Sequence, residues 1–545
     1  MSVNIARLFR KILPVTSIAM VGIGFTALSA PRTDADSNEK TVISYTTGSP
    51  LALDAPKNWG TRYSRVIRLR YSGSANGQLI ATFESWPADL GIYRSTDDGL
   101  TWTKIAPVVE KHTPGWNFRV EPDLLELPCA CGNLPAGTIL LAANAGNGGK
   151  AHQLEIQYST DHGLTWNFRG VVDDNRSTPG GMWEPNLGLT SSGQLICYYS
   201  DERFQSEGYN QLLGERVSPD GGLTWGKEIY ACAIPGGAQR PGMAVVKKLP
   251  NGQYVMSFET GGTWGSQVHI KFSRDGVNWG SGPGDYGIPV QNAKGAFIGG
   301  TPYIMWMPGG GSKGTLCLTA SVLTNTPNVD REMFLNYDLG KGDWTEVPCP
   351  VQWQGGDGLA GWSCGMIPTA DGTGVIQLAS SITGHNVCQM FVARETIVRP
   401  GDSYAVINAN SGLAVGIPNN TRVRGTRLRQ CAVKKSAAQR WVLNDLGNNV
   451  WTITNPGNGL AWDDAGWFKT PDSFVDQYDL NGLAVQQWRL SPVGDGTWKF
   501  VNVNSNLAMA VSGASTSVDA KIAQEVDNGA RDCDWTLKDP GTPRR

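Results

Sequence analysis

A turn motif of the form S-x-D-x-G-x-T-W is repeated along the first half of this chain and constrains the fold more than any other feature. Full copies begin at Ser95, Ser159 and Ser218, and a shortened copy begins at Ser273. In each copy the aspartate can accept hydrogen bonds from its own turn, the glycine permits a positive φ, and the tryptophan packs the hairpin against its neighbours. This motif, an Asp-box, is therefore predicted to fold a hairpin and to leave no carboxylate free for chemistry.

A second repeat, a glycine turn followed by an apolar strand, occurs six times at intervals of 56 to 62 residues. Its glycines are Gly77, Gly137, Gly193, Gly252, Gly314 and Gly372. A repeat of this length, in a chain with 68 glycines and 20 tryptophans, predicts one four-stranded sheet per repeat, arranged around an axis. We therefore expect an all-β protein in which residues 40–399 form a six-bladed β-propeller.

The composition changes near residues 399–401, where a different repeat begins. Trp441, Trp488 and Trp535 follow one another at intervals of 47 residues, and the first two end a Q-x-W sequence. Three such repeats resemble the ricin-B-type β-trefoil, a lectin-like fold whose repeats end in Q-x-W. The third repeat departs from this ending, because Cys533 stands where glutamine is expected. Residues 400–545 are therefore predicted to form a β-trefoil that acts as a carbohydrate-binding module.

Charge and cysteine usage exclude several classes of function. The formal net charge is −2 and 17% of the residues are charged, so the chain has no basic field to attract nucleic acid. Nothing in the sequence indicates a redox cofactor, a nucleotide or a catalytic metal. Ten cysteines permit disulfides but do not fix any pairing. Two self-contained β domains do not require an oligomer, so we expect a monomer.

Residues 1–35 are predicted to be a secretory signal peptide. Three basic residues precede an uncharged run over residues 12–30, and residues 27–30 are small enough to precede a cleavage site. We therefore expect a secreted, extracellular protein that has no contact with the membrane once the signal is removed. The alternative interpretation is an uncleaved membrane anchor, since the run is long for a signal peptide.

Chemistry in a propeller is expected where the innermost strands converge on the axis. Glu184, between Trp183 and Pro185, opens such a strand in the third repeat, and Glu259 follows Phe258 at the end of a strand in the fourth. Carboxylates are rarely buried unless they are paired or functional. Two carboxyl groups facing one cleft suit glycosidic cleavage, in which one protonates the leaving oxygen and the other attacks or activates water. The alternative is that each glutamate pairs with an arginine and ties blades together.

Three stretches, residues 183–185, 240–243 and 257–262, resemble the exo-α-1,5-L-arabinanases of glycoside hydrolase family 93. That family has a six-bladed, sialidase-like propeller, retains anomeric configuration and releases arabinobiose from the end of linear arabinan. The resemblance places its two catalytic glutamates on Glu184 and Glu259, with carboxyl groups about 5–5.5 Å apart. We prefer Glu184 as the nucleophile and Glu259 as the acid/base, and the sequence leaves the reverse assignment open.

Five further residues are candidates for contact with the substrate. Trp362 falls where the family places an aromatic hydroxyl, so it keeps a stacking surface and loses a hydrogen bond. The other four are charged, and each is interpreted equally well as part of an ion pair between blades. These four are Arg65, Glu121, Asp201 and Arg240.

One of the three trefoil repeats carries the residues expected of a sugar site. Trefoil lectins of this type hold an aspartate close to the start of the repeat, and only the second repeat has one there, Asp463. Trp467, Tyr478 and Asn481 follow as stacking and polar partners. We predict one sugar site in the second repeat. The alternative is a folded module that binds nothing.

Together these features predict a secreted, retaining, exo-acting glycoside hydrolase that cleaves α-1,5-L-arabinan, with arabinan or pectin side chains as its polysaccharide substrate. One alternative is an exo-sialidase, but the F/Y-R-I-P start of sialidases is replaced by Tyr63-Ser64-Arg65-Val66-Ile67. The other alternative is a lectin without catalytic activity, because propellers and trefoils both serve as binding modules.

Overall fold

The computed structural model describes most of the chain after residue 42, so the predicted signal peptide lies outside the described residues. The described ranges are 43–54, 60–85, 90–109, 112–113, 115–116, 118–147, 150–175, 179–280, 282, 284–309, 313–324, 331–353, 360–370, 372–382, 388–398, 401–446, 450–492 and 497–538. Within these ranges every regular element is a β-strand or a short 3₁₀ helix, which confirms the all-β prediction. None of these helices is long and apolar enough to cross a membrane. All ten cysteines lie as separate thiols.

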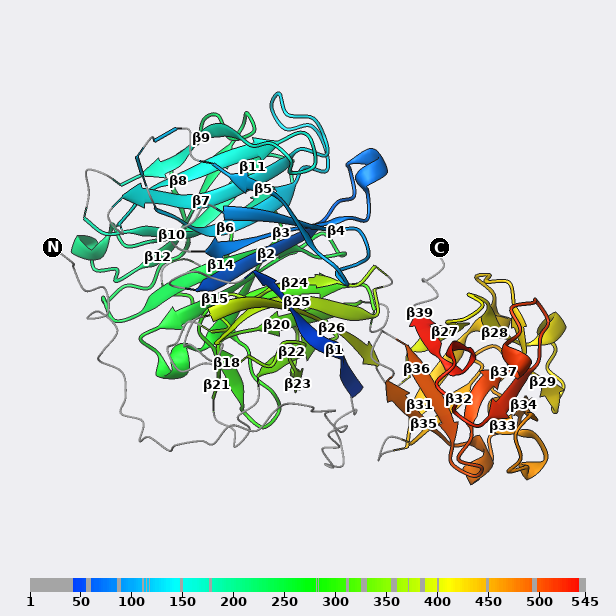
Figure 1. The fold of residues 1–545 in the computed structure, drawn as a ribbon. Coiled ribbons are helices and arrows are strands. Elements are labelled where there is room, and N and C mark those ends of the chain that lie inside the picture. The colour runs from blue at the N-terminus through cyan, green and yellow to red at the C-terminus, as the bar shows by residue number, and fades with distance from the viewer. Residues whose placement is uncertain are drawn as a thin grey trace, which may run out of the picture. The chain divides into compact units, whose positions relative to one another are not determined.

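The described residues up to Val398 form six four-stranded antiparallel sheets, the blades of the predicted propeller (Figure 1), and a two-stranded sheet of β18 (Phe297–Gly299) and β21 (Val322–Thr324). Each glycine turn joins the first two strands of a blade. From the inner to the outer strand, the blades are β2 (Thr61–Arg68), β3 (Leu79–Ser85), β4 (Leu90–Ser95), β5 (Thr103–Val108); β6 (Phe118–Glu126), β7 (Ile139–Asn147), β8 (Lys150–Ser159), β9 (Asn167–Asp174); β10 (Met182–Leu189), β11 (Leu195–Asp201), β12 (Leu212–Ser218), β13 (Ile229–Cys232); β14 (Arg240–Lys248), β15 (Tyr254–Gly261), β16 (Val268–Ser273), β17 (Ile288–Pro289); β19 (Tyr303–Met307), β20 (Thr315–Thr319), β22 (Glu332–Asn336), β23 (Thr345–Pro348); β24 (Gly365–Pro368), β25 (Gly374–Ile382), β26 (Cys388–Val398) and β1 (Ile43–Asp54).

The ring of blades is closed by the first strand of the chain. β1 pairs antiparallel with β26, with Ile43 opposite Val398 and Thr47 opposite Arg394, so the N-terminal strand is the outermost strand of blade six. The inner strands β2, β6, β10, β14, β19 and β24 contact one another in sequence, and β24 contacts β2. This contact ring brings the starts of six strands, separated by about sixty residues each, to one place.

The Asp-boxes fold hairpins, as the sequence predicts. Asp161 Oδ1 accepts the Ser159 hydroxyl at 2.7 Å and the backbone N–H of Thr165 at 2.9 Å, while its Oδ2 accepts the Thr165 hydroxyl at 2.6 Å. The indole N–H of Trp166 closes the turn by donating to the Gly163 carbonyl oxygen at 3.0 Å. Both carboxylate oxygens are thus used within the turn, which makes the motif structural.

Residues 401–538 form the trefoil, and its internal repeat is visible in the hydrogen bonds. The indole N–H groups of Trp441, Trp488 and Trp535 each donate to the carbonyl oxygen 26 residues earlier. These tryptophans are fully buried in one apolar core. The strands are β27 (Ser403–Asn408), β28 (Ala414–Gly416), β29 (Thr426–Arg427), β30 (Arg429–Cys431), β31 (Trp441–Asp445), β32 (Val450–Thr454), β33 (Ala461–Asp464), β34 (Ser473–Tyr478), β35 (Trp488–Pro492), β36 (Trp498–Asn502), β37 (Ala508–Val511), β38 (Ile522–Glu525) and β39 (Trp535–Lys538).

The structure explains how the third repeat tolerates Cys533 in place of glutamine. Gln439 and Gln486 each accept a backbone N–H and donate to a backbone carbonyl of the preceding loop, which pins that loop. In the third repeat Cys533 is buried, and Asp527 accepts the N–H of Gly529 in the same loop. The loop therefore closes on itself, and the fold does not need the missing amide.

Candidate active site

Near the start of the inner strand of each blade lies a residue with left-handed backbone conformation, and none of these six residues is glycine. Their φ angles are 54° at Tyr63, 54° at Glu121, 59° at Glu184, 57° at Met243, 47° at Thr301 and 49° at Ser363. In the first four blades the pairing with the second strand shifts at this point, which is a β-bulge. A left-handed conformation costs a non-glycine residue free energy of order 1 kcal/mol or more, and such strain concentrates at functional sites.

At three of these left-handed residues the backbone N–H group points at an acidic side chain of the preceding blade. The N–H of Glu184 donates to Glu121 Oε2 at 2.8 Å, that of Met243 to Glu184 Oε2 at 3.3 Å, and that of Thr301 to Glu259 Oε2 at 2.5 Å. Three glutamates from blades two, three and four are therefore each held by the backbone of the next blade.

Glu184, one of the two predicted catalytic residues, is half-buried at the head of β10. Its Oε2 accepts the Ser200 hydroxyl at 2.5 Å in addition to the Met243 N–H. Nothing among the described residues donates to its Oε1. Burial raises the pKa of Glu184 well above its usual value, and the neighbouring Glu121 carboxyl raises it further, while the bond from Ser200 opposes the shift.

Glu259, the other predicted catalytic residue, is half-buried near the end of β15 and pairs with Gly242 in the strand ladder. Because Met243, the next residue, donates to Glu184, the two glutamates lie on either side of the Gly242-Met243 segment. Burial raises the pKa of Glu259, and the Thr301 N–H and the charge of Arg240 oppose this shift. Within the described residues its Oε1 also has no hydrogen-bond donor.

A third glutamate, Glu121, lies beside this pair. Its Oε2 accepts Asn144 Nδ2 at 2.6 Å as well as the N–H of Glu184. Burial and, next, the charge of Glu84 raise the pKa of Glu121 to about 7. Glu84 is itself paired with Arg62 at 2.7 Å. Blades one to four thus each contribute one carboxyl group to this region, and these groups belong to Glu84, Glu121, Glu184 and Glu259.

The guanidinium of Arg65 is hydrogen-bonded to other residues of the protein. It is 1% exposed, its Nε donates to Asp123 of blade two at 3.1 Å, and its Nη1 donates to the Ser363 hydroxyl of blade six at 3.1 Å. The guanidinium also lies over the ring of Tyr63, 4.2 Å from the centroid. Of the two interpretations of Arg65, the structure favours the ion pair between blades, and we do not retain it as a substrate contact.

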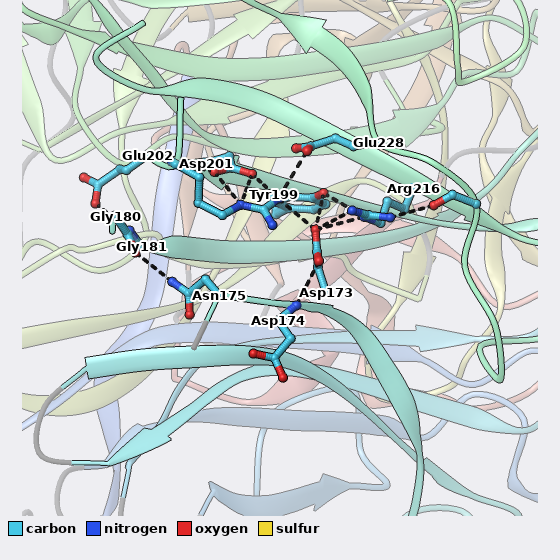
Figure 2. Close-up of polar contacts among 12 residues, drawn as sticks. Asp173, Asp174, Asn175, Gly180, Gly181, Tyr199, Asp201, Glu202, Arg216 and Glu228 are labelled. Atoms are coloured by element: carbon cyan, nitrogen blue, oxygen red, sulfur yellow. Dashed lines mark hydrogen bonds and ion pairs between the residues drawn. The ribbon is translucent and has the colours of Figure 1, made fainter. Parts of the chain in front are cut away.

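Asp201 is likewise part of an ion-pair network, which joins β9 of blade two to β11, β12 and the residues before β13 of blade three (Figure 2). Asp201 is fully buried, and Arg203 donates to both of its oxygens. Arg203 also pairs with Asp173 at 2.8 Å and Glu228 at 3.2 Å, and Arg216 pairs with Asp173 at 2.7 Å. Because its charge is used inside the sheet, Asp201 is not retained as a substrate contact.

Arg240 and Trp362 remain accessible. The Arg240 side chain is 44% exposed and donates to Glu202 and Gln211 at 2.6 and 2.7 Å. Trp362 is half-buried, with the guanidinium of Arg62 5.6 Å from its ring centroid. Both residues stay candidates for contact with a sugar.

The residues predicted for the trefoil sugar site come together in the second repeat. Asp463 is hydrogen-bonded to Gln486, which also accepts the backbone N–H of Asn481 at 2.8 Å. Trp467 and Tyr478 expose 60% and 44% of their surface. The two exposed aromatic side chains offer flat apolar surfaces on which sugar faces can stack, and the sugar site stays a prediction.

Sequence reasoning missed three groups of the propeller site, namely the N–H groups of Met243 and Thr301 and the side chain of Arg62. The first two belong to non-glycine residues with left-handed backbone conformation, so the sequence carries no signal for them. Arg62 lies three residues before Arg65, and the only signal of its pairing with Glu84 was two opposite charges, one near the start of a strand and one near the end of the next.

Comparison with known proteins supports the resemblance. The chain is similar to the solved structure of Penicillium chrysogenum alpha-L-arabinanase complexed with arabinobiose, with 29% identity, a TM-score of 0.55 and coverage of 64% of this chain and 98% of that one. It is also similar to the alpha-L-arabinofuranosidase of Fusarium graminearum, solved with an iminosugar inhibitor (26% identity, TM-score 0.54) and, as the GH93 enzyme, with arabinobiose (25% identity, TM-score 0.54), each covering 65% of this chain and 98% of the other. Residues 387–478 and 484–543 match the family model "Ricin-type beta-trefoil lectin domain-like". No curated protein matches the chain.

Proposed function

We propose that this protein is a retaining, exo-acting glycoside hydrolase that cleaves α-1,5-L-arabinan and releases arabinobiose. The observation that carries the proposal is the pair of half-buried carboxyl groups, Glu184 and Glu259, which backbone amides hold on adjacent blades. The proposal is supported by the similarity of the chain to an arabinanase solved with arabinobiose.

In the proposed mechanism the two glutamates divide the work of a double displacement. Glu184 attacks the anomeric carbon through Oε1 while Glu259 gives its proton to the departing glycosidic oxygen, which breaks the C–O bond and forms a glycosyl ester. Glu259, now ionised, takes a proton from water, and the resulting nucleophile cleaves the ester and releases Glu184. The Ser200 hydroxyl and the Met243 N–H, which both donate to Glu184 Oε2, support an ionised nucleophile. Burial raises the pKa of both glutamates, so the assignment of Glu259 as the acid rests on the resemblance.

The charge distribution supports a neutral sugar over a sialic acid as substrate. Four carboxyl groups stand at the heads of blades one to four, and they repel a carboxylate substrate. Arg62, Arg65 and Arg240, at the starts of the inner strands of blades one and four, are each paired with an acid of the protein. A sialidase needs arginines that are available to a substrate carboxylate.

We further propose that the protein is secreted as a monomer and that its trefoil holds it on the polysaccharide, either arabinan or the arabinan side chains of pectin. The similarity of residues 387–543 to trefoil lectins and the exposed Trp467 and Tyr478 support a sugar-binding role. After removal of the signal, no part of the proposal involves a membrane.

The test is a product profile of the protein on linear α-1,5-arabinan, with sialyl-lactose as a second substrate. Arabinobiose as the sole early product, with the α-anomer formed first in a proton NMR time course, is the expected result. Free sialic acid moves the assignment to a sialidase. The absence of product from both substrates, for a protein that still binds arabinan, makes the propeller a binding platform.

A further inference from the structure

Glu121 occupies in blade two the bulge position that Glu184 occupies in blade three, and its carboxyl group is fixed by the protein. Its Oε2 accepts the Glu184 N–H at 2.8 Å and Asn144 Nδ2 at 2.6 Å. These donors belong to β10, the inner strand of the next blade, and to β7, the strand that pairs with β6. The hydrogen bond to Glu184 therefore fixes the backbone that carries the proposed nucleophile.

The carboxyl groups of Glu121 and Glu184 also act on each other through their charges. Burial is the main obstacle to ionisation of both groups, and the charge of Glu121 is the next largest obstacle for Glu184. The titratable and charged groups that face the pair from the surrounding strands are Glu84 on β3, Arg62, Tyr63 and Arg65 on β2, and Glu259 on β15. Arg62 pairs with Glu84, and its charge also opposes the upward shift in the pKa of Glu121, whereas Arg65 pairs with Asp123.

We infer that Glu121 is a positioning residue that acts on the substrate only through Glu184, by anchoring the bulge of blade three and by placing a second carboxyl group beside the proposed nucleophile. This inference rests on the proposed function. It replaces the prediction that Glu121 contacts the substrate.

The pairing has a direct chemical consequence. Two carboxyl groups that interact in a buried site lose their protons in two steps that belong to the pair, so the pair holds one proton over an interval of pH. When Glu184 becomes an ester, its charge disappears and Glu121 ionises more easily. Glu121 thereby sets the pH at which Glu184 becomes a nucleophile and takes no part in bond making.

The first test is the pH dependence of kcat/KM on arabinan for Glu121→Gln and Glu121→Ala. Gln keeps an oxygen that accepts the Glu184 N–H and loses the charge, whereas Ala loses both. We expect the acidic limb to move to lower pH by about one unit in both variants, because a like charge has been removed, and kcat to fall at least tenfold more in Ala than in Gln. Glu126→Gln, at the other end of β6, is the matched control, and its acidic limb of kcat/KM is expected at the same pH as in the wild type. A limb that does not move in Glu121→Gln, or a rise in KM alone, overturns the inference.

The second test does not depend on hydrolysis. The protein is labelled with ¹³C at the glutamate carboxyl carbon, and the resonances of Glu121 and Glu184 are assigned by their loss in Glu121→Gln and Glu184→Gln. Each variant is expected to move the titration of the other carboxyl to lower pH by about one unit, since the coupling is reciprocal. If arabinan is not hydrolysed but this reciprocal shift is present, the proposed function fails and the coupling stands. If the titration of Glu184 is unchanged in Glu121→Gln and that of Glu121 is unchanged in Glu184→Gln, the inference fails whatever the protein hydrolyses.

Discussion

The backbone N–H of Thr301 on blade five donates a 2.5 Å hydrogen bond to Oε2 of Glu259 on blade four. Thr301 reaches this position with a φ of 47°, a conformation that is strained for a β-branched residue. The position of an acid in one blade is thus determined by the backbone of the next, and the same relationship recurs between Met243 and Glu184.

Replacing either proposed catalytic glutamate should remove hydrolysis and leave the fold intact. Glu184→Gln and Glu259→Gln are each expected to lower kcat on arabinan by about 10²-fold or more, because proton transfer or nucleophilic attack is lost. Glu126→Gln serves as the control, since its side chain bonds Ser72 and the backbone of residues 70–71. Hydrolysis is measured as reducing ends released, with circular dichroism as the check of folding.

The roles of the two glutamates can be separated by the configuration of a trapped product. With an activated aryl arabinoside and sodium azide, Glu259→Ala is expected to give the α-arabinosyl azide, because Glu184 still forms the ester and azide then displaces it. Glu184→Ala is expected to give the β-azide by direct displacement. Proton NMR of the anomeric centre distinguishes the two, and exchanged configurations show the reverse assignment of nucleophile and acid/base.

Glu215 makes the propeller less stable at alkaline pH. It is fully buried on β12, where its Oε2 accepts the indole N–H of Trp279 at 2.9 Å, and burial raises its pKa from 4.5 to about 9. Between these values the unfolded chain loses a proton that the folded protein keeps, so stability falls as the pH rises. Glu215→Gln should therefore match the wild type at pH 4 and melt several degrees higher at pH 9. Melting curves that keep the same separation at every pH contradict this.

An Asp-box variant should lose stability without losing activity. Asp275 accepts the N–H groups of Val277 and Asn278, both at 2.8 Å. Burial acts to raise its pKa, but these bonds lower it to about 2, so its contribution is present above pH 3.8 and is lost as the pH falls toward 2. Asp275→Ala is expected to lower the free energy of unfolding by about 1–3 kcal/mol. Urea unfolding measures this, with the exposed Arg274→Ala as control and kcat unchanged in both.

Two adjacent aspartates of the trefoil should respond differently to substitution. Asp464 accepts Asn504 Nδ2 at 3.0 Å and Gln524 Nε2 at 2.6 Å, which ties the second repeat to the third. Asp464→Ala is therefore expected to destabilise the trefoil. Asp463→Ala is expected to weaken retention on insoluble arabinan at least tenfold while hydrolysis of soluble oligosaccharides is unchanged. Equal retention of Asp463→Ala and the wild type shows that the second repeat holds no sugar site.

The fold was predictable because its signals are local. A glycine turn or a Q-x-W ending is read from a few consecutive residues, and its recurrence at about 60 or 47 residues distinguishes a propeller from a trefoil. Glu184 and Glu259 were predicted for a similar reason, since Glu184 lies between Trp183 and Pro185 near the start of a strand and Glu259 follows Phe258 near the end of one. The role of Arg65 was not predictable, because its partner Asp123 is 58 residues away in another blade.

The sequence by itself determined which folds the chain adopts, where each blade and each trefoil repeat begins, and which acids stand at the heads of inner strands. Only the tertiary structure decided that β1 closes the ring against β26, that Asp201 and Arg65 are consumed by internal ion pairs, and that Glu121, Glu184 and Glu259 are held by amides of the next blade. The physical reason is that turns and periodicity depend on neighbours in the chain. The pairing of a buried charge and the cost of a left-handed bulge depend instead on groups that only the closed ring brings within hydrogen-bonding distance.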